Sequence, residues 1–505
     1  MRVSVVVPVF DPGRYLHDLL ASLRAQTLDP AEFEVVFVDD GSTDGSAEVL
    51  DAAAAETPNL RVVHIPNSGW PGRPRNIGID AARGDHVFLC DHDDRLAPDA
   101  LQRLTDFAIE HDSDVVVGRI VGVGRPAPER IFARTLVDAQ QDLGLLMSSL
   151  TPQKLYRRAF LHEQDIRFPE GPRRLEDHLF VTKAYLRARR VSIYADHPVY
   201  YFVLRDDGRN ASRRPIEWHG YYANAAESIA VVDAEAPDEA TRVLLRRRWL
   251  RTEALARLRG KRLLEQRDRA DLLGAARDLL QQHYPVEEVD LLSPPERLIG
   301  RLLLDGRVDD VVAFAEWEAA IRVRVDVVEA VLDRAGRMRA TVGAAAHPAS
   351  PLPDVFRDLP AGFPTAAELE RVAVLPDGVR LAARLAGPGG ASVEAAVQQE
   401  TAEGVLTAAL ELDPAELPAG EWRLRVTAAG AGRTRVEPAK AADVLPVTRA
   451  SIPGRRLVLS PGRNGALVLT VEAAGPRAVL RRSATRALRA PRHLLTGARR
   501  RPRRG

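Results

Sequence analysis

The first 110 residues alternate between short apolar runs and longer segments in which apolar residues recur at helical spacing. The opening run "VSVVVPVF" is rich in β-branched residues, which is typical of a strand buried on both faces of a parallel sheet. The runs "FEVVFVDD", "LRVVHI" and "HVFLCD" predict three further strands, and the segments between them have the spacing or the capping residues of helices. This order predicts an α/β domain with a mostly parallel sheet and helices on both faces.

The pattern changes twice after this domain. Charged helical spacing, as in "TRVLLRRRWLRTEALARLRGKRLLEQ", predicts a helical linker or bundle. Short alternating strands separated by Gly, Pro and Asp turns then predict an all-β sandwich. We therefore expect an α/β domain over residues 1–215, a helical linker over 216–320, a β-sandwich over 321–472 and a basic tail over 473–505.

Composition narrows the class of protein. The single cysteine, Cys90, excludes an intramolecular disulfide and is expected to be buried in a protein of a reducing compartment. No run of eighteen apolar residues predicts a membrane span, and the chain start is interpreted as a strand rather than a signal peptide. We therefore expect a cytoplasmic protein.

The tail over 473–505 carries eleven arginines and no acidic residue. Such a block suits phosphates or an anionic membrane surface, and peripheral contact with the inner face of the membrane is one interpretation. A solvated tail without a defined function is the other. Because no aromatic residues are interleaved with these arginines for base stacking, we expect no nucleic-acid partner.

Acidic residues gather where the predicted strands end, which is where ligands bind in open α/β sheets. Asp91, Asp93 and Asp94 fall within four positions, and their mutual repulsion would be relieved by a divalent cation with oxygen ligands. A helix cap is the structural alternative for Asp94. A cap does not explain why both Asp91 and Asp93 precede it.

Three other positions have a functional and a structural interpretation. Asp40 ends the second strand and could accept the imide N–H of a uracil ring, or it could form an Asx-turn. Arg75 heads a predicted helix and could clamp a diphosphate, or it could be a surface arginine. Glu176 and Asp177 begin a later helix, where acidic residues commonly complement the helix dipole. A general base there would have to face the cation site.

Five motifs in this order resemble the family 2 glycosyltransferases with a GT-A fold: "VSVVVPVFD", "VDDGSTDGS", "NSGWPGRPRNIGI", "FLCDHDDRLAPDAL" and "EDHLF". The resemblance covers residues 1–215. It implies a Rossmann-like GT-A domain that performs inverting, metal-dependent sugar transfer from a nucleotide diphosphate donor, with Mn²⁺ or Mg²⁺ as the cofactor.

The resemblance also implies roles for individual residues. On the donor side, the matching residues are Pro8, Val9 and Phe10 in the nucleotide pocket, Asp40 at the uracil, and Arg75 and Asn76 near the diphosphate and sugar. Asp91 matches a residue near the ribose and sugar, and Asp93 together with Asp91 matches the metal ligands. Asp177 matches the general base, and Glu176 matches its neighbour at the acceptor. Two positions depart from the usual pattern: His92 in the middle of D-x-D, and Asp11, where many relatives have Asn.

The architecture more specifically resembles the bacterial poly(ribitol phosphate) N-acetylglucosaminyltransferases, which glycosylate teichoic acids. These enzymes share the GT-A domain, a helical linker and C-terminal immunoglobulin-like modules that can mediate oligomerisation. The segment "PVYYFVLRDDGRNAS" resembles the end of their catalytic domain and places Arg205 near phosphates at the acceptor side. The resemblance implies a UDP-sugar donor, GlcNAc or another hexose or N-acetylhexosamine, and a hydroxyl of a cell-envelope polymer as acceptor.

Two other functions stay open at this point. A nucleotidyltransferase would share the parallel sheet, the metal and the acidic strand ends, but "PVFDPGRYL" has only one glycine for a phosphate loop. A non-catalytic polymer-binding or assembly protein would rely on the sandwich and the tail.

Overall fold

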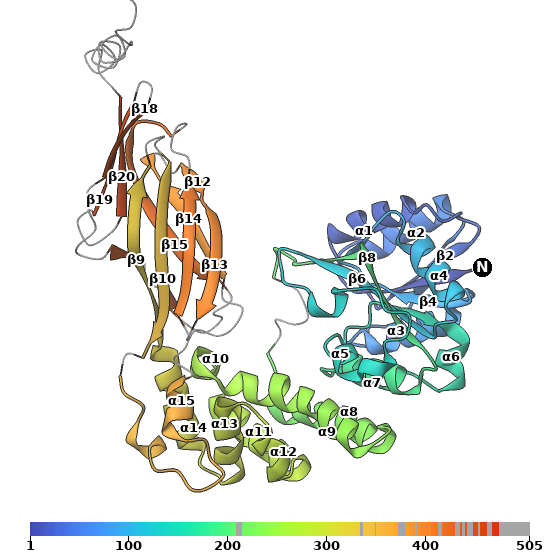
Figure 1. Ribbon diagram of the computed structural model, residues 1–505. Helices are drawn as coiled ribbons and strands as arrows, with labels where there is room; N and C mark the ends of the chain where they lie inside the picture. The colour runs from blue at the N-terminus through green and yellow to red at the C-terminus, as the bar shows by residue number, and fades with distance from the viewer. Residues whose placement is uncertain are drawn as a thin grey trace, which may run out of the picture. The chain divides into compact units, whose positions relative to one another are not determined.

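The computed structural model describes residues 1–208 and 215–333 continuously. Farther on it describes 337–348, 350–371, 380–388, 391–402, 405–412, 417–429, 435–436, 440–441, 448–452, 455–461 and 467–473. The predicted basic tail lies outside the described residues except for Ala473. The chain divides into two compact units (Figure 1). The first contains Met1–Leu258 and Gln266–Val308, and the second contains Arg259–Glu265 and Asp309–Gly505.

The first unit is built on an eight-stranded sheet in the order β3-β2-β1-β4-β7-β6-β8-β5. The pairs β1–β2, β2–β3, β1–β4 and β6–β8 are parallel, whereas β7 runs antiparallel to β4 and β6, and β5 runs antiparallel to β8. The strands are β1 (Val3–Val9), β2 (Phe33–Asp39), β3 (Leu60–His64), β4 (His86–Leu89), β5 (Arg95–Leu96), β6 (Val115–Val123), β7 (Leu155–Arg157) and β8 (Val191–Val203). The predicted α/β domain with a mostly parallel sheet is confirmed.

Burial explains the apolar run at the start of the chain. All seven residues of β1 are buried, as expected for a strand covered on both faces. The helix α3 (Gly72–Ala81) lies so close to β1 that a Cβ on Gly78 would overlap Cγ1 of Val6, so only glycine fits there. The helices of this domain are α1 (Tyr15–Arg24), α2 (Ser46–Glu56), α3 (Gly72–Ala81), α4 (Ala100–Glu110), α5 (Leu143–Leu146), α6 (Arg158–Glu163) and α7 (Glu176–Arg187).

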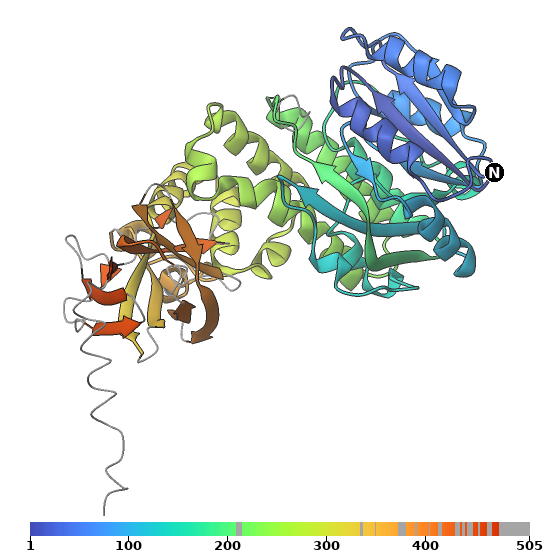
Figure 2. The same ribbon diagram turned by 90° about the horizontal axis from the view of Figure 1, so that it is seen from above.

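A group of helices follows the sheet, as the charged helical pattern predicted. Its members are α8 (Trp218–Glu235), α9 (Glu239–Arg248), the π-helical turn η4 (Trp249–Ala254), η5 (Leu255–Leu258), α10 (Gly260–Leu264), α11 (Arg269–His283), α12 (Val286–Asp290), α13 (Pro294–Leu304) and α14 (Val308–Ala320). The helix α7 at the end of the sheet domain packs against α8 (Figure 1 and Figure 2). The side chain of Asp238 caps α9, and Ser293 and Glu296 form a capping box on α13, so local sequence signals fix these helix starts. Of the helices that the structure describes, none is long and apolar enough to cross a membrane.

The second unit contains two β-sheets, β13-β14-β10-β9-β16 with β17 beside β9, and β12-β11-β15-β20-β19-β18. Both contribute to one apolar core in which Trp422 is 1% exposed, so the sheets form the two layers of a sandwich. Its immunoglobulin-like character and its role in oligomerisation stay predictions. The strands are β9 (Arg322–Leu332), β10 (Met338–His347), β11 (Arg380–Ala386), β12 (Ser392–Glu394), β13 (Ala396–Ala402), β14 (Val405–Leu412), β15 (Gly420–Ala429), β16 (Arg435–Val436), β17 (Lys440–Ala441), β18 (Thr448–Ile452), β19 (Arg455–Pro461) and β20 (Leu467–Ala473).

Candidate functional site

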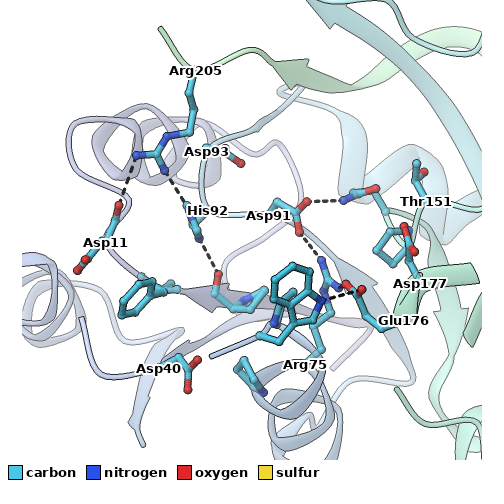
Figure 3. Close-up of a pocket in the computed structure, with 18 of the residues that line it drawn as sticks. Asp11, Asp40, Arg75, Asp91, His92, Asp93, Thr151, Glu176, Asp177 and Arg205 are labelled. Atoms are coloured by element: carbon cyan, nitrogen blue, oxygen red, sulfur yellow. Dashed lines mark hydrogen bonds and ion pairs between the residues drawn. The ribbon is translucent and has the colours of Figure 1, made fainter. Parts of the chain in front are cut away.

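A cavity of about 670 Å³ lies at the carboxyl ends of β1, β2 and β4 and at the start of α7 (Figure 3). With one exception, every residue predicted from the sequence to form the site lines this cavity. They are Pro8, Val9, Phe10, Asp40, Arg75, Asp91, Asp93, Glu176, Asp177 and Arg205. The exception is Asn76.

Arg75 connects the two acidic motifs across the cavity. Its guanidinium donates from Nη2 to Oδ1 of Asp91 at 2.9 Å and from Nη1 to Oε1 of Glu176 at 3.2 Å. Arg75 is only 5% exposed and the side chain of Glu176 is 10% exposed, so this ion pair is largely removed from water, whereas the side chain of Asp91 is 27% exposed. The other oxygen of Asp91 accepts from Nε2 of Gln153 at 2.6 Å. Both carboxylate oxygens of Asp91 are therefore held by protein donors.

The other two aspartates of the acidic cluster have different surroundings. Asp93 lines the cavity, and burial raises its pKa above the ordinary value. Asp94 is 1% exposed and accepts hydrogen bonds from the Tyr200 hydroxyl at 2.6 Å and from the Val203 amide at 2.7 Å. The interpretation of Asp94 as a helix cap is wrong, because its side chain instead holds the end of β8 against the acidic loop.

His92 bridges the first strand and Arg205. Its Nδ1 lies 3.0 Å from the carbonyl oxygen of Pro8, and its Nε2 lies 3.3 Å from Nη1 of Arg205. A carbonyl can only accept, so Nδ1 carries the proton and Nε2 accepts from the guanidinium. Arg205 also pairs with Asp207 at 2.6 Å and lies 4.9 Å from the ring of Tyr15. The departure from the usual D-x-D pattern thus places a neutral imidazole where it orients a buried arginine.

Glu176 and Asp177 begin α7 and face the cavity. Glu176 accepts from Nε1 of Trp70 at 2.8 Å in addition to Arg75. Burial, and next the negative charge of Glu176, raise the pKa of Asp177 to about 7, although Arg75 opposes this shift. The preceding residue, Leu175, has φ 63°, a left-handed conformation that costs energy for a leucine and is often found at functional sites. Asp177 is therefore a carboxyl group suited to proton transfer near neutral pH.

The remaining predicted residues have mainly local partners. Asp40 is 3% exposed and accepts from the Ser68 amide at 2.7 Å and from the Ser68 hydroxyl at 2.9 Å. Asn76 exchanges hydrogen bonds of 2.9 Å with the backbone of Phe168, donating to its carbonyl and accepting from its amide. The Phe168 ring lies 5.1 Å from the guanidinium of Arg75. Asn76 therefore supports the wall behind Arg75.

Sequence reasoning did not select several cavity residues. Trp70 stands within the quoted motif "NSGWPG", and its position beside the predicted diphosphate clamp was a usable signal. Gln153 and Thr151 lie in a segment that has no motif. Arg125 lines the cavity with its guanidinium 3.7 Å from the ring of Phe202, and one arginine in a loop gives no sequence signal.

These features can be compared with known proteins. The family model described as glycosyl transferase family 2 matches residues 4–195, and the one described as glycosyl transferase TarS linker domain matches residues 218–315. The chain is 34% identical over 247 residues to the poly(ribitol-phosphate) beta-glucosyltransferase of Bacillus spizizenii, which covers 48% of this chain and 39% of that protein. It is 37% identical over 224 residues to the poly(ribitol-phosphate) beta-N-acetylglucosaminyltransferase TarS of Staphylococcus aureus, which covers 44% of this chain and 39% of that protein.

A solved structure agrees with this match. The crystal structure of S. aureus TarS 1-349 in complex with UDP-GlcNAc is 31% identical and has a TM-score of 0.58, over 63% of this chain and 91% of that one. The two curated relatives are longer than the matched region, and the chain spans 39% of the length of each.

Proposed function

Because the chain belongs to the family 2 glycosyltransferases, we propose that it transfers a sugar from a UDP-sugar to a hydroxyl group of a polyol-phosphate polymer of the cell envelope, such as poly(ribitol phosphate). The observation that carries this proposal is that Asp93, Arg75 and Asp177 line the same cavity. The donor sugar is GlcNAc or another hexose or N-acetylhexosamine, since one relative is named a glucosyltransferase and another an N-acetylglucosaminyltransferase.

The donor side of the cavity suits a UDP diphosphate with a hard divalent cation. The described residues contain no group of three or more His, Cys, Asp or Glu side chains that could hold a metal ion by themselves. A cation such as Mn²⁺ or Mg²⁺ commonly takes one or two carboxylates together with phosphate oxygens, and Asp93 fits that role. When bound, the cation would neutralise charge that develops on the departing UDP.

Residues of the protein would bind the diphosphate and the uracil ring of the donor. Asp91, whose oxygens are bound by Arg75 and Gln153, holds Arg75 in place beside the diphosphate. Asp40, at the end of β2, already accepts two hydrogen bonds from Ser68 and would accept a further one from the imide N–H of the uracil ring. A carboxylate oxygen has more than one lone pair, so such a second hydrogen bond is available.

We assign proton transfer to Asp177. As the acceptor oxygen bonds to the anomeric carbon, the bond from that carbon to the diphosphate oxygen breaks and its electron pair leaves with UDP. The acceptor proton moves to the carboxylate of Asp177. A single displacement of this kind inverts the anomeric configuration. Arg205 and Arg125, which line the same cavity, supply positive charge that suits the phosphates of a polymeric acceptor.

A donor panel tests this function. UDP release from several UDP-sugars is measured with and without poly(ribitol phosphate), in Mn²⁺ and in EDTA, for wild type, Asp93→Asn and Asp18→Asn. Asp18 is an exposed aspartate on α1 and serves as the matched control. We expect polymer-dependent UDP release that EDTA and Asp93→Asn abolish and that Asp18→Asn leaves unchanged.

Three further measurements can reject the proposal. Pyrophosphate release from nucleoside triphosphates, without UDP release, would indicate a nucleotidyltransferase. Failure to bind or cleave any UDP-sugar would indicate a polymer-binding protein. NMR of the product would test inversion directly, because a product with the donor's anomeric configuration contradicts a single displacement.

A further inference from the structure

Lys154 is a fully buried lysine directly behind the cavity. It is 0% exposed, although lysine is almost never buried without a partner. The chain has only four lysines among its 71 basic residues, so arginine is its usual cation. Arginine cannot lose its proton in a protein, whereas a buried lysine readily can. A lysine at this buried position therefore allows a change of charge that the chain's usual cation would not allow.

Lys154 belongs to a set of buried side chains that hold the segment 149–152 by its carbonyl groups. The Tyr185 hydroxyl donates to the carbonyl of Ser149 at 2.9 Å, and the Tyr156 hydroxyl donates to that of Pro152 at 3.1 Å. The Lys154 ammonium donates to the carbonyl of Thr151. This segment supplies Thr151 and Pro152 to the cavity wall, and the next residue, Gln153, also lines it.

The ammonium is also within electrostatic range of the predicted base. Burial lowers the pKa of Lys154 to about 7, and the charge of Asp177 opposes that shift. Figure 3 places Thr151, the residue that Lys154 holds, on the same side of the cavity as Asp177. Among the described residues no direct ion pair joins Lys154 and Asp177, so the interaction acts at longer range.

Other groups also act on Asp177, and each of them either favours or disfavours its ionised form. Glu176, on the same helix, disfavours its ionised form, whereas Arg75 from α3 and Arg248 from the end of α9 favour it. Burial, and to a lesser extent the charge of Asp177, raise the pKa of the Tyr156 hydroxyl on β7, so this hydroxyl stays neutral. Both arginines keep their charge at every relevant pH. Of the cations that act on Asp177 in the described part of the chain, Lys154 is the one whose charge can change near neutral pH.

We propose that Lys154 is a positioning residue that holds the Thr151–Gln153 wall and favours the ionised form of Asp177, so that it extends the reaction to lower pH. This inference rests on the proposed role of Asp177 as the base. Lys154 does not touch the substrate. It acts through the carbonyl of Thr151 and through its charge.

The test compares pH profiles of kcat/KM between pH 5.5 and 9 for wild type, Lys154→Met, Lys154→Gln and Lys183→Met. Methionine removes the charge and keeps the length. Glutamine also removes the charge but can still donate to the carbonyl of Thr151, so it replaces the methionine variant if that one does not fold. Lys183, on α7, is the matched control.

We expect the acid limb to move up by about one pH unit in both Lys154 variants, as for a nearby charge that does not touch the carboxylate. It should not move in Lys183→Met. Adding Lys154→Met to Asp177→Asn should produce no shift in pH dependence, because the titrating base is already gone. An acid limb at the wild-type pH in a folded Lys154 variant would overturn the proposal.

A second readout does not depend on activity. Because the unfolded chain binds the lysine proton more tightly than the folded one, wild-type stability should rise between about pH 7 and pH 10, and Lys154→Met should lack this rise. In Asp177→Asn the rise should begin at lower pH, since the anion that favours the ammonium is gone. If no UDP-sugar is turned over while this coupling is present, the proposed function fails and the Lys154–Asp177 interaction stands. If the coupling is absent, the Lys154 proposal fails.

Discussion

The ionisation of Asp177 should govern how the reaction rate depends on pH. Its pKa is raised to about 7, chiefly by burial. A base must be deprotonated to act, so with this pKa about half of the molecules are competent at pH 7. At pH 6 the competent fraction falls to about one tenth, and at pH 8 it rises to about nine tenths. We therefore expect kcat to rise about tenfold from pH 6 to its plateau above pH 8.

Asp177→Asn separates this effect from other titrations. The amide is similar in size but cannot accept the proton, so kcat should fall by about a hundredfold to ten-thousandfold and lose its acid limb. Donor binding, measured by calorimetry with UDP, should change little because Arg75, Asp91 and Asp93 stay in place. UDP release at saturating donor, with circular dichroism to confirm the fold at each pH, provides the assay. A wild-type rate constant that differs by less than twofold between pH 6 and pH 8 would refute the reasoning.

Three further predictions concern buried residues of the same domain. Arg75→Met leaves the buried carboxylate of Glu176, and the partly exposed one of Asp91, without their shared cation. We expect a loss of about 3–5 kcal/mol in unfolding free energy by denaturant titration, whereas an unchanged midpoint would contradict this ion-pair network. Gly78→Ala should lower the free energy of unfolding by about 1–3 kcal/mol, because the added methyl group overpacks against β1. Adding Val6→Ala should restore part of this stability, and a double variant as unstable as Gly78→Ala would exclude the overlap with Val6 as the cause. Cys90 is 1% exposed and burial raises its thiol pKa well above the ordinary value, so mass spectrometry should detect no maleimide adduct until the protein is unfolded.

Local patterns predicted the elements and much of the cavity. The continuous apolar runs indicated buried strands, and parallel strands bring their carboxyl ends to one edge of a sheet. For that reason Asp40 and the Asp91–Asp93 pair could be placed together before any contact was known. The sequence order of the motifs added Asp177, which spacing alone assigned only to a helix start.

The contacts that sequence reasoning missed join residues far apart in the chain. Asp94 binds Tyr200, 106 positions away, and Asn76 binds Phe168, 92 positions away. A helix cap was a reasonable interpretation of Asp94 because caps depend on neighbouring residues, whereas its actual partner depends on how β8 pairs within the sheet. Gln153 gave no signal for the same reason, since its role exists only once β4 and β7 lie side by side.

The two compact units are not two consecutive stretches of chain. Residues Arg259–Glu265 belong to the second unit, while Gln266–Val308 return to the first. A gene fragment that ends before the β-sandwich therefore still encodes a piece of the second unit, and no single cut separates the two. Recombination that exchanged the sandwich as a cassette would leave α10 behind with new neighbours. Designed chimaeras that exchange one unit will thus need two junctions, one on each side of α10, besides the one after α13.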